Sequence, residues 1–323
     1  MACDCGNGDG ATTALRSHGH RHEDPIIEEA GDPSKGVDSI SSLPDEILHI
    51  ILSSLSTKFA IRTSILSKRW RHVWPDTPSL SFDWRTCIHK PKADSINKTL
   101  DRYTARKMIS FRLCASMKDY MPHIDRWIEF AMSRDVENMS LNLDNGGDDK
   151  YHVPDFFYTN NSVKQLSVDL GYYGLRIPSS SVSWTSLKKL SLRNCKLSRE
   201  CIDKILSGCP ILESLKLYFC NELRVLDVRK SQSLRTLEID RSYWAPSPTQ
   251  IVAPQIHCLR LSNSQLPCTF VDVSSLTEAS LHICFSSTKK LTADFLLDMF
   301  LKMLDKLQNV DKLTFGASFL LHQ

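Results

Sequence analysis

Cysteine and histidine are the residue types in this chain best suited to chemistry, and a first group of them lies near the N-terminus. It consists of Cys3, Cys5, His18, His20 and His22. Such side chains can ligate a metal ion, but the surrounding tract is rich in Gly, Asp and Thr and has few large apolar residues, which is typical of a solvated tail. We therefore expect residues 1–36 to be disordered and to hold no physiological metal.

A second group consists of four cysteines separated by 6, 8 and 11 residues: Cys195, Cys201, Cys209 and Cys220. These separations give no C-x-x-C pair of the kind found in zinc sites. A cysteine beside a short repeat strand usually serves as a small apolar side chain. We interpret all four as parts of a core.

Known catalytic motifs are missing from the sequence. It contains no H-E-x-x-H zinc motif, no G-x-S-x-G nucleophile motif and no Walker phosphate loop. The scattered His and Asp residues form no pattern to which catalytic roles could be assigned. We expect a protein that is not an enzyme and that needs no cofactor.

Composition excludes further classes of protein. The net charge is +3, from 40 Lys and Arg against 37 Asp and Glu, which predicts no strong attraction to nucleic acid or to an anionic membrane. No apolar run approaches the ~18 residues of a membrane span, and the first thirty residues lack the apolar core of a secretory signal. The eleven cysteines are scattered and odd in number, which favours a reducing compartment. We therefore expect the nucleus and/or the cytoplasm as location.

The elements that would position a binding surface begin at residues 43–74, where three short amphipathic helices are predicted. Pro44 suits the first helical position, and the acidic residues after it favour the positive end of a helix dipole. Thr57 can cap the second helix and Ser67 the third. The apolar residues on one face of the first helix are Ile47, Leu48, Ile51, Leu52 and Leu55. So small a unit cannot bury all of its apolar side chains, and it needs the rest of the chain or a partner.

Residues 40–83 resemble the F-box of plant F-box proteins. Three blocks carry the resemblance in order: LPDEIL, LSSL and RTSILSKRWRHVW. The resemblance implies docking onto a Skp-type adaptor and, through it, onto the cullin of an SCF-type ubiquitin ligase. The residues implied to form or support that contact are Leu43, Pro44, Ile47, Leu48, Leu52, Ile65, Leu66 and Trp70.

Two residues depart from the pattern of this family. Phe59 stands where an acidic residue usually precedes the Ala of the second helix, and Ser56 replaces a frequent proline. We expect the docking helices to form in spite of both changes, which bear on the preference for one adaptor over another.

Repetition dominates the chain after the F-box. Runs of the form L-x-x-L-x-L recur, with steps of 22 to 27 residues through the first six of them. The runs are VENMSLNL (136–143), VKQLSV (163–168), LKKLSL (187–192), LESLKL (212–217), LRTLEI (234–239), IHCLRL (256–261), a weaker LTEASLHI (276–283) and VDKLTF (310–315). This motif and period are typical of leucine-rich repeats, whose leucines become buried only when neighbouring repeats stack. We predict an α/β fold in which a curved solenoid carries a parallel sheet on its concave face.

The connectors between these runs support the prediction. Residues 123–133, 198–208 and 292–307 show helical periodicity, with Gly208 as a C-terminal stop. The run at 223–228 leaves no room for a helix on either side, so we assign it to a strand on the convex side. The residues on the predicted helix faces are Ile124, Trp127, Ile128, Ala131, Ile202, Ile205, Leu206, Phe295, Met299, Met303 and Leu307.

The repeat region is also similar to the plant F-box/leucine-rich-repeat family that often ends in an FBD domain. Stretches such as VSWTSLKKLSL and ILSGCPILESLKL carry this similarity over most of residues 95–323. No FBD segment follows the last repeat strand here, so we expect an open edge at that strand. The domain boundaries that we predict are a tail at 1–36, an F-box at 37–83 and repeats at 84–323.

The concave face of the predicted sheet is the expected binding surface for a protein substrate. Strand alternation turns the residues between and beside the leucines outward. These residues are Gln165, Ser167, Asp169, Lys189, Ser191, Arg193, Ser214, Lys216, Tyr218, Thr236, Glu238, Asp240, Arg260 and Ser262. Those expected to contact the substrate are Lys189, Arg193, Lys216, Tyr218, Glu238, Asp240 and Arg260, with Tyr218 as the best single anchor.

The sequence thus predicts a two-part adaptor, with the ligase scaffold bound at one end and an unidentified protein substrate at the other. The alternative is a non-catalytic repeat scaffold for protein–protein interaction without ligase function. An RNA-binding protein is disfavoured because the charge is near neutral and no basic stripe is present. We expect neither a nucleic acid nor a membrane as partner.

Overall fold

The computed structural model of this chain describes residue 40 and residues 42–320, apart from 84, 86–91, 145–150, 172–176, 178–180, 221–222, 241–249, 265–267 and 287–292. The chain divides into two compact units, residues 1–40 and 41–323. The predictions for residues 1–36, including the Cys and His group, lie outside the described residues. Everything below concerns the second unit.

The predicted three-helix unit is confirmed. Its elements are α1 (Asp45–Ser53), α2 (Thr57–Arg62), η1 (Thr63–Ile65), α3 (Trp70–Val73) and η2 (Trp74–Asp76). Six residues form its buried cluster: Leu48, Leu52, Ala60, Trp70, Val73 and Trp74. The unit therefore has a core of its own, separate from the core of the repeats.

The helix starts differ from the predicted ones. Pro44 is the N-cap residue of α1 and not its first helical residue, and Arg69 takes the N-cap position of α3 in place of Ser67. Thr57 is the first residue of α2, and its side chain is buried instead of capping. Its Oγ1 accepts a hydrogen bond of 2.7 Å from the backbone N–H of Ser81. Thr57 was predicted to cap its own helix, but its side chain instead links α2 to the first strand of the sheet.

A ten-stranded parallel sheet follows, and it contains all eight runs predicted as strands. Its strands, in spatial order, are β1 (Ser79–Asp83), β2 (Ser110–Ser116), β3 (Asn138–Asp144), β5 (Gln165–Asp169), β7 (Lys189–Arg193), β8 (Ser214–Tyr218), β10 (Thr236–Asp240), β12 (Cys258–Ser264), β14 (Glu278–Ser286) and β15 (Lys312–Leu320). The first two were not predicted. Leu80 in β1 and Phe111 in β2 take the inward position that a leucine takes in most of the later strands.

Shorter strands lie outside this sheet. Strands β9 (Val225–Asp227), β11 (Gln250–Val252) and β13 (Thr269–Asp272) form a separate parallel sheet of three strands. This confirms that residues 223–228 leave the main sheet. Strand β4 (Thr159–Asn160), which follows η4 (Asp155–Tyr158), pairs with β6 (Ser183–Trp184).

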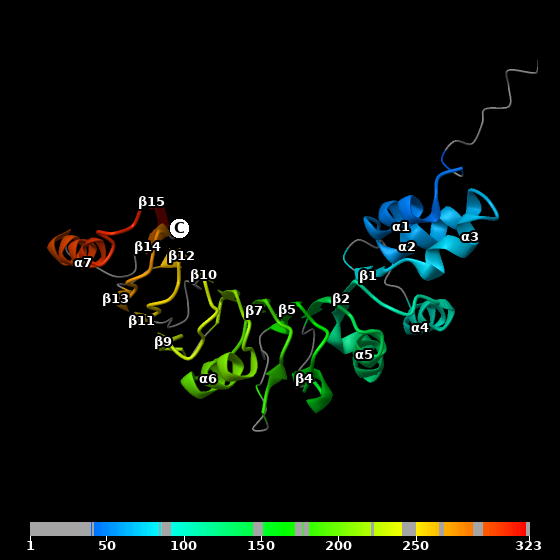
Figure 1. Ribbon diagram of the computed structural model, residues 1–323, viewed down its shortest axis with the longest axis horizontal. Coiled ribbons are helices and arrows are strands. Elements are labelled where there is room, and N and C mark those ends of the chain that lie inside the picture. The colour runs from blue at the N-terminus through cyan, green and yellow to red at the C-terminus, as the bar shows by residue number, and fades with distance from the viewer. Residues whose placement is uncertain are drawn as a thin grey trace, which may run out of the picture. The chain divides into compact units, whose positions relative to one another are not determined.

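The helices of the repeats are α4 (Ala93–Arg102), α5 (Met117–Met132), α6 (Arg199–Gly208) and α7 (Ala293–Asp305). Figure 1 shows α4, α5 and α6 on the same side of the strands, so the opposite face of the sheet is left open. The predicted buried faces of α5 and α6 are confirmed. Met303 and Leu307 are buried near the end of α7, whereas the side chains of Phe295 and Met299 are not described. Helix α4 was not predicted.

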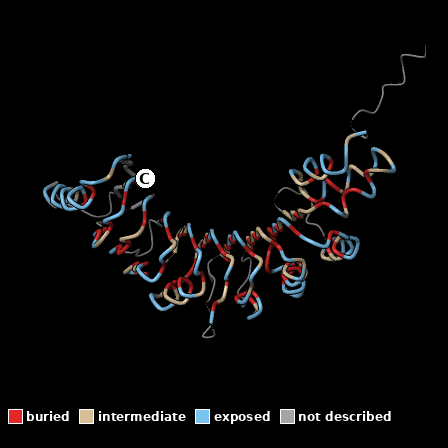
Figure 2. Tube along the Cα trace, in the orientation of Figure 1, coloured by how far each residue is buried: buried red, intermediate tan, exposed pale blue. Residues whose placement is uncertain are grey.

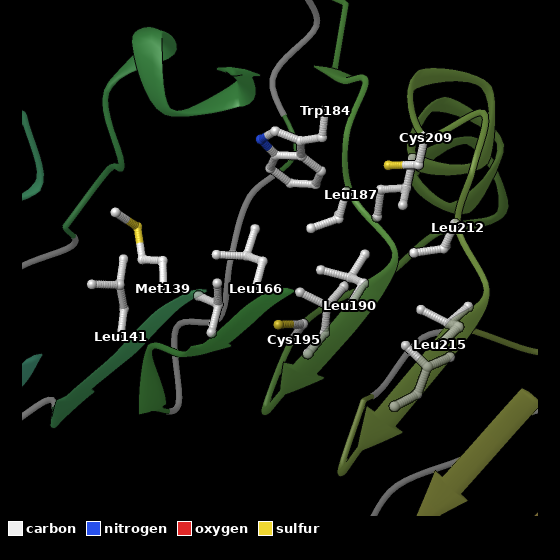
Figure 3. Close-up of a cluster of buried hydrophobic side chains, with 14 of the residues drawn as sticks. Met139, Leu141, Leu166, Trp184, Leu187, Leu190, Cys195, Cys209, Leu212 and Leu215 are labelled. Carbon is white, nitrogen blue, oxygen red and sulfur yellow. The ribbon is translucent and has the colours of Figure 1, made fainter. Parts of the chain in front are cut away.

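The repeat core is a ladder of inward side chains that keep register from strand to strand. Leu166, Leu190, Leu215 and Leu237 are aligned and almost fully buried. Figure 3 shows neighbouring members of this ladder beneath Trp184, and Figure 2 shows buried residues concentrated between sheet and helices. The leucines predicted as core, which also include Leu192, Leu217 and Leu259, are all buried.

Two of the four clustered cysteines belong to this core as predicted. Cys195 and Cys209 are fully buried, and burial raises the pKa of the Cys209 thiol to about 12. Cys201 and Cys220 are partly buried and pack against the same cluster. Cys195 and Cys209 are therefore core side chains as predicted, whereas Cys201 and Cys220 lie at the edge of the core, where Cys220 Sγ is 3.5 Å from the carbonyl oxygen of Leu192.

Gly208 ends α6 for a reason that the sequence did not reveal. A Cβ atom at this position would lie 2.2 Å from the carbonyl oxygen of Val182. Glycine is thus required for the close approach of two backbones, and not as a left-handed stop. Gly208→Ala should lower the free energy of unfolding by about 1–3 kcal/mol through overpacking. This runs against the gain of ~1 kcal/mol that alanine brings to an ordinary helix.

Chemical denaturation of the full chain measures this effect. The matched control is Ser207→Ala, at an exposed position of the same helix, which should change stability by less than about 0.5 kcal/mol. An increase in stability with Gly208→Ala would show that the close approach to Val182 is wrong.

Candidate interaction surfaces

The F-box unit exposes several large apolar side chains. The exposed fractions are 85% for Ile65, 67% for Ile50, 61% for Leu66, 48% for Phe59, 41% for Ile47 and 38% for Ile51. We call these six residues the exposed F-box set. Large apolar side chains gathered on one small unit are typical of a surface that a partner covers.

Three of the residues predicted to form or support the adaptor contact are buried. Leu48, Leu52 and Trp70, which were included among the adaptor-contacting or supporting residues, are at most 3% exposed. They form the core and can only support a contact. Leu43 packs half-buried against that core, whereas Pro44 is exposed. Their roles in adaptor binding stay predictions.

The apolar positions of α1 are distributed around more than one face of the helix. Ile47, Ile50 and Ile51 lie three and four residues apart, which places them on one exposed side, while Leu48 and Leu52 occupy the buried side. A unit of three short helices can bury only one of these sides. Ile50 was not predicted as a surface residue, because the apolar residues of this helix were interpreted as a single stripe.

Hydrogen bonds fix the segment that presents Ile65 and Leu66. The Leu66 N–H donates to the carbonyl of Thr63, and the Thr63 hydroxyl donates to the carbonyl of Ala60. Arg71 Nε donates to the carbonyl of Ser64 at 3.2 Å. The exposed side chains of Ile65 and Leu66 are therefore held on a hydrogen-bonded turn.

An ion pair also joins the beginning of α1 to the turn before α3. The Arg69 guanidinium donates to Oδ1 of Asp45 through both Nε and Nη2. The Asp45 side chain is 60% exposed, so this pair is worth little energy by itself. It does hold the N-terminus of α1 close to the turn that follows Leu66.

The open face of the ten-stranded sheet carries the second surface. All fourteen side chains predicted to point outward are exposed or partly exposed, so the predicted alternation is confirmed. They are aligned in rows by the strand register, in which Ser167, Ser191, Lys216 and Glu238 follow one another across four strands. Their assignment to substrate contact stays a prediction.

Four of the predicted contact residues form one network with each other. The Arg193 guanidinium lies 4.4 Å from the centre of the Tyr218 ring. The Tyr218 hydroxyl donates to Oε1 of Glu238 at 2.7 Å, and Lys216 Nζ lies 2.8 Å from Oε2 of the same carboxylate. Arg193 Nε also lies 3.8 Å from Oδ2 of Asp169. We call these five residues the central network.

The central network controls the ionisation of Glu238. Partial burial acts to raise the pKa of this carboxyl, but the hydrogen bonds from Lys216 and Tyr218 outweigh it and hold the pKa below its ordinary value. Glu238 is therefore ionised at neutral pH. Burial and the hydrogen bond to Glu238 raise the pKa of Tyr218, which keeps its hydroxyl protonated as a donor.

A hollow of about 540 Å³ lies beside this network, over strands β2 to β8. Its polar lining is rich in hydroxyl, amide and cationic groups and contains no carboxylate. The lining residues are Ser110, Arg112, Asn138, Met139, Ser140, Gln165, Leu166, Ser167, Lys189, Leu190, Ser191, Ser214 and Lys216. Lys189 and Lys216 were predicted as contact residues, but Arg112 was not, because strand β2 was not predicted.

The other predicted contact residues lie next to these features. Arg260 is opposite Glu238 on the neighbouring strand, and Asp240 is opposite Tyr218.

Within the described ranges, no group of three His, Cys, Asp or Glu side chains could hold a metal ion. No helix in those ranges has the length and apolar character that crossing a membrane requires.

Parallel strands that recur at repeat spacing, with helices on one side of the sheet, define a leucine-rich-repeat protein, here joined to an N-terminal helical unit. Residues 103–314 match the family model described as At1g61320/AtMIF1, LRR domain, and residues 40–82 match the F-box domain. The chain belongs to the F-box/LRR-repeat family, as the resemblance of its sequence predicted.

Relatives from Arabidopsis thaliana are similar over most of the chain. The F-box/LRR-repeat protein At5g02910 is 56% identical over 290 residues, which make up 90% of this chain and 62% of that protein. The putative F-box protein At1g49610 is 54% identical over 320 residues, 99% of this chain and 77% of that protein. F-box/LRR-repeat protein 25 is 50% identical over 268 residues, 81% of this chain and 98% of that protein. The chain thus spans less than two thirds of the first of these relatives.

Proposed function

We propose that this chain is the substrate-recognition subunit of an SCF-type cullin–RING ubiquitin ligase. Its F-box unit binds a Skp-type adaptor and through it a cullin, and its repeats bind the protein to be ubiquitinated. The observation that carries this proposal is the exposed F-box set, six large apolar side chains on a unit that already has its own core. The location that suits this role is the nucleus and/or the cytoplasm.

The adaptor interface follows from the division between buried and exposed residues in the F-box unit. Core residues such as Leu48 keep the helices together, while Ile65 and Leu66 offer apolar area that only a partner can cover. Apolar anchors near the centre of an interface often account for most of its binding energy. Pro44 and Leu43 flank this set at the start of α1 and belong to the proposed interface.

The substrate interface is proposed on the open sheet face, at the hollow and the central network. Cations in the network already have counterions, because Arg193 pairs with Asp169 and Lys216 with Glu238. Among the described residues, Arg112 and Lys189 in the hollow form no such pair. A substrate segment therefore finds donors in the hollow and an aromatic ring beside it at Tyr218.

In this role the chain contributes proximity and not chemistry. Holding a substrate close to a charged ubiquitin carrier raises the effective concentration of its lysines, without any catalytic group on this chain. The alternative, a repeat scaffold without ligase function, would bind a protein through the repeats and no adaptor through the F-box unit. Adaptor binding distinguishes the two.

Filling the hollow should remove the substrate while leaving the adaptor bound. Ser191 lines the hollow, so Ser191→Trp places a bulky ring where the substrate would lie, and Tyr218→Ala removes the aromatic anchor. Ser207→Trp, on the exposed side of α6, is the matched control. The measurement is quantitative mass spectrometry of proteins purified with each variant from plant cells in which cullin activation is blocked.

We expect wild type and the control to recover a common set of proteins. The recovered amount of these proteins should fall by at least about tenfold with Ser191→Trp and with Tyr218→Ala. Recovery of the adaptor should be equal in all four samples, and circular dichroism of each purified variant shows that its repeats are folded. If the same proteins accompany Ser191→Trp and Tyr218→Ala as accompany wild type, the substrate site is not on this face.

A further inference from the structure

A second cavity, of about 420 Å³, lies where the F-box unit meets the first repeats. Its walls come from α2 of the F-box unit and from β1, α4, β2 and the first turn of α5, which lie together at the N-terminal end of the sheet (Figure 1). This volume lies within the ~300–1,000 Å³ of small-molecule sites. None of the residues proposed for adaptor or substrate contact lines it.

The interior of this cavity is mainly apolar. Ile96, Ala115 and Tyr120 are buried residues that line it, and Ile61 and Phe82 add partly buried apolar side chains. Two of the lining rings pack against other aromatic side chains. The ring centres of Phe82 and Phe111 are 6.2 Å apart in an edge-to-face arrangement, and those of Tyr120 and Trp127 are 5.7 Å apart. The cavity is therefore bounded by side chains that are packed from behind.

Two cationic side chains and one carboxylate belong to the lining. Lys58 and Arg62 are four residues apart on α2, which places both on the side of the helix that borders the cavity. The one acidic lining residue, Asp83, accepts hydrogen bonds from the backbone N, Nε and Nη2 of Arg85. Burial acts to raise the pKa of Asp83, but these bonds hold the pKa below its ordinary value, so this charge is already satisfied.

We propose that this cavity binds a small amphipathic anion, an aromatic or aliphatic carboxylic acid. Its apolar body would occupy the space between Ile96, Ala115 and Phe82, with the carboxylate at Arg62. Charge-assisted hydrogen bonds from a guanidinium to a carboxylate are strong and specific for this geometry. A cation of the same size would meet Arg62, which forms no ion pair with another described residue, and should be rejected.

Occupancy of this cavity would reinforce the connection between the F-box unit and the repeats. The hydrogen bond from the Ser81 N–H to Thr57 Oγ1 joins α2 to β1 in the lining itself. A ligand that contacts both elements adds to this connection and stabilises the folded chain by an amount that rises with the logarithm of its concentration once that concentration exceeds Kd. The inference does not rest on the proposed ligase function, because it concerns binding by the chain alone.

Calorimetric titration of the full chain with three matched probes tests the proposal. The probes are 4-phenylbutyrate, 4-phenylbutanol and 4-phenylbutylamine, which share one apolar body and differ in charge. We expect the acid to bind with one-to-one saturation, the alcohol to bind at least about tenfold more weakly and the amine more weakly still. Equal affinity for acid and amine, or no saturable binding of the acid, would overturn the proposal.

Variants then locate the site. Arg62→Glu should weaken binding of the acid by at least about tenfold, and Ser95→Trp, at the exposed part of the lining, should block entry. Arg106→Glu makes the same change at an exposed arginine outside the lining and should bind like wild type. Circular dichroism shows whether each variant is folded. If folded Arg62→Glu binds the acid like wild type, the proposed site is wrong whatever the effect of Ser95→Trp.

Discussion

Replacing Leu215 with alanine is expected to lower the free energy of unfolding by about 2–5 kcal/mol. Leu215 is fully buried, and the register places it between Leu190 and Leu237 on the neighbouring strands. Each repeat contacts mainly its neighbours, so a void in one layer weakens two interfaces at once. Urea denaturation monitored by circular dichroism gives the change in free energy.

The same substitution at an exposed leucine is the matched control. Leu301 on α7 is 57% exposed, and Leu301→Ala should change stability by less than about 0.5 kcal/mol. Equal effects of Leu215→Ala and Leu301→Ala would show that the inward ladder is misassigned.

Periodicity was sufficient to predict most of the sheet. Runs with an aliphatic residue at the first position and mostly leucine at the fourth were found because each repeat must bury the same two or three side chains. Strand β2 was missed because an aromatic residue, Phe111, takes the fourth position in MISFRL, where the runs that were found have Leu, Met or Ala. Pattern matching that accepts any large apolar residue at these positions would have found it, since all three inward residues, Met108, Phe111 and Leu113, are buried.

Alternation was likewise sufficient to predict which side chains point outward, but not how they pair. Arg193, Tyr218 and Glu238 lie on three successive strands of the sheet. Their contacts depend on a register that single repeats do not reveal. The cavity beside Thr57 was not predictable either, because it is lined by elements that are distant in sequence, from Ser56 to Tyr120.

In the F-box unit the three helices could be predicted from the sequence, but the side of α1 that stays exposed could not. Amphipathic spacing identified Leu48 and Leu52, yet these leucines face Trp70 in the core and not a partner. A short helix with apolar residues on two sides leaves the choice of buried side to tertiary packing. The structure resolves this choice in favour of a surface formed by the exposed F-box set.

Removing two members of that set should abolish tight adaptor binding without loss of stability. Ile65 and Leu66 are 85% and 61% exposed, so the double variant Ile65→Ala/Leu66→Ala loses little packing within the chain. Truncating an apolar side chain that is buried at the centre of an interface often costs more than ~2 kcal/mol of binding free energy. For two such side chains this corresponds to a loss of affinity well above tenfold. Leu48→Ala should show the opposite pattern, with a loss of ~2–5 kcal/mol in stability because Leu48 is fully buried.

The central claim, that the F-box unit is a docking surface for a Skp-type adaptor, is tested most directly by titrating the purified adaptor into the full chain. Wild type and a control double variant at exposed leucines of α7, Leu301→Ala/Leu304→Ala, should bind with the same affinity. The Ile65→Ala/Leu66→Ala variant should bind more than about tenfold more weakly at an unchanged melting temperature. Equal affinity of all three proteins, or no binding of the adaptor by wild type, would contradict the account.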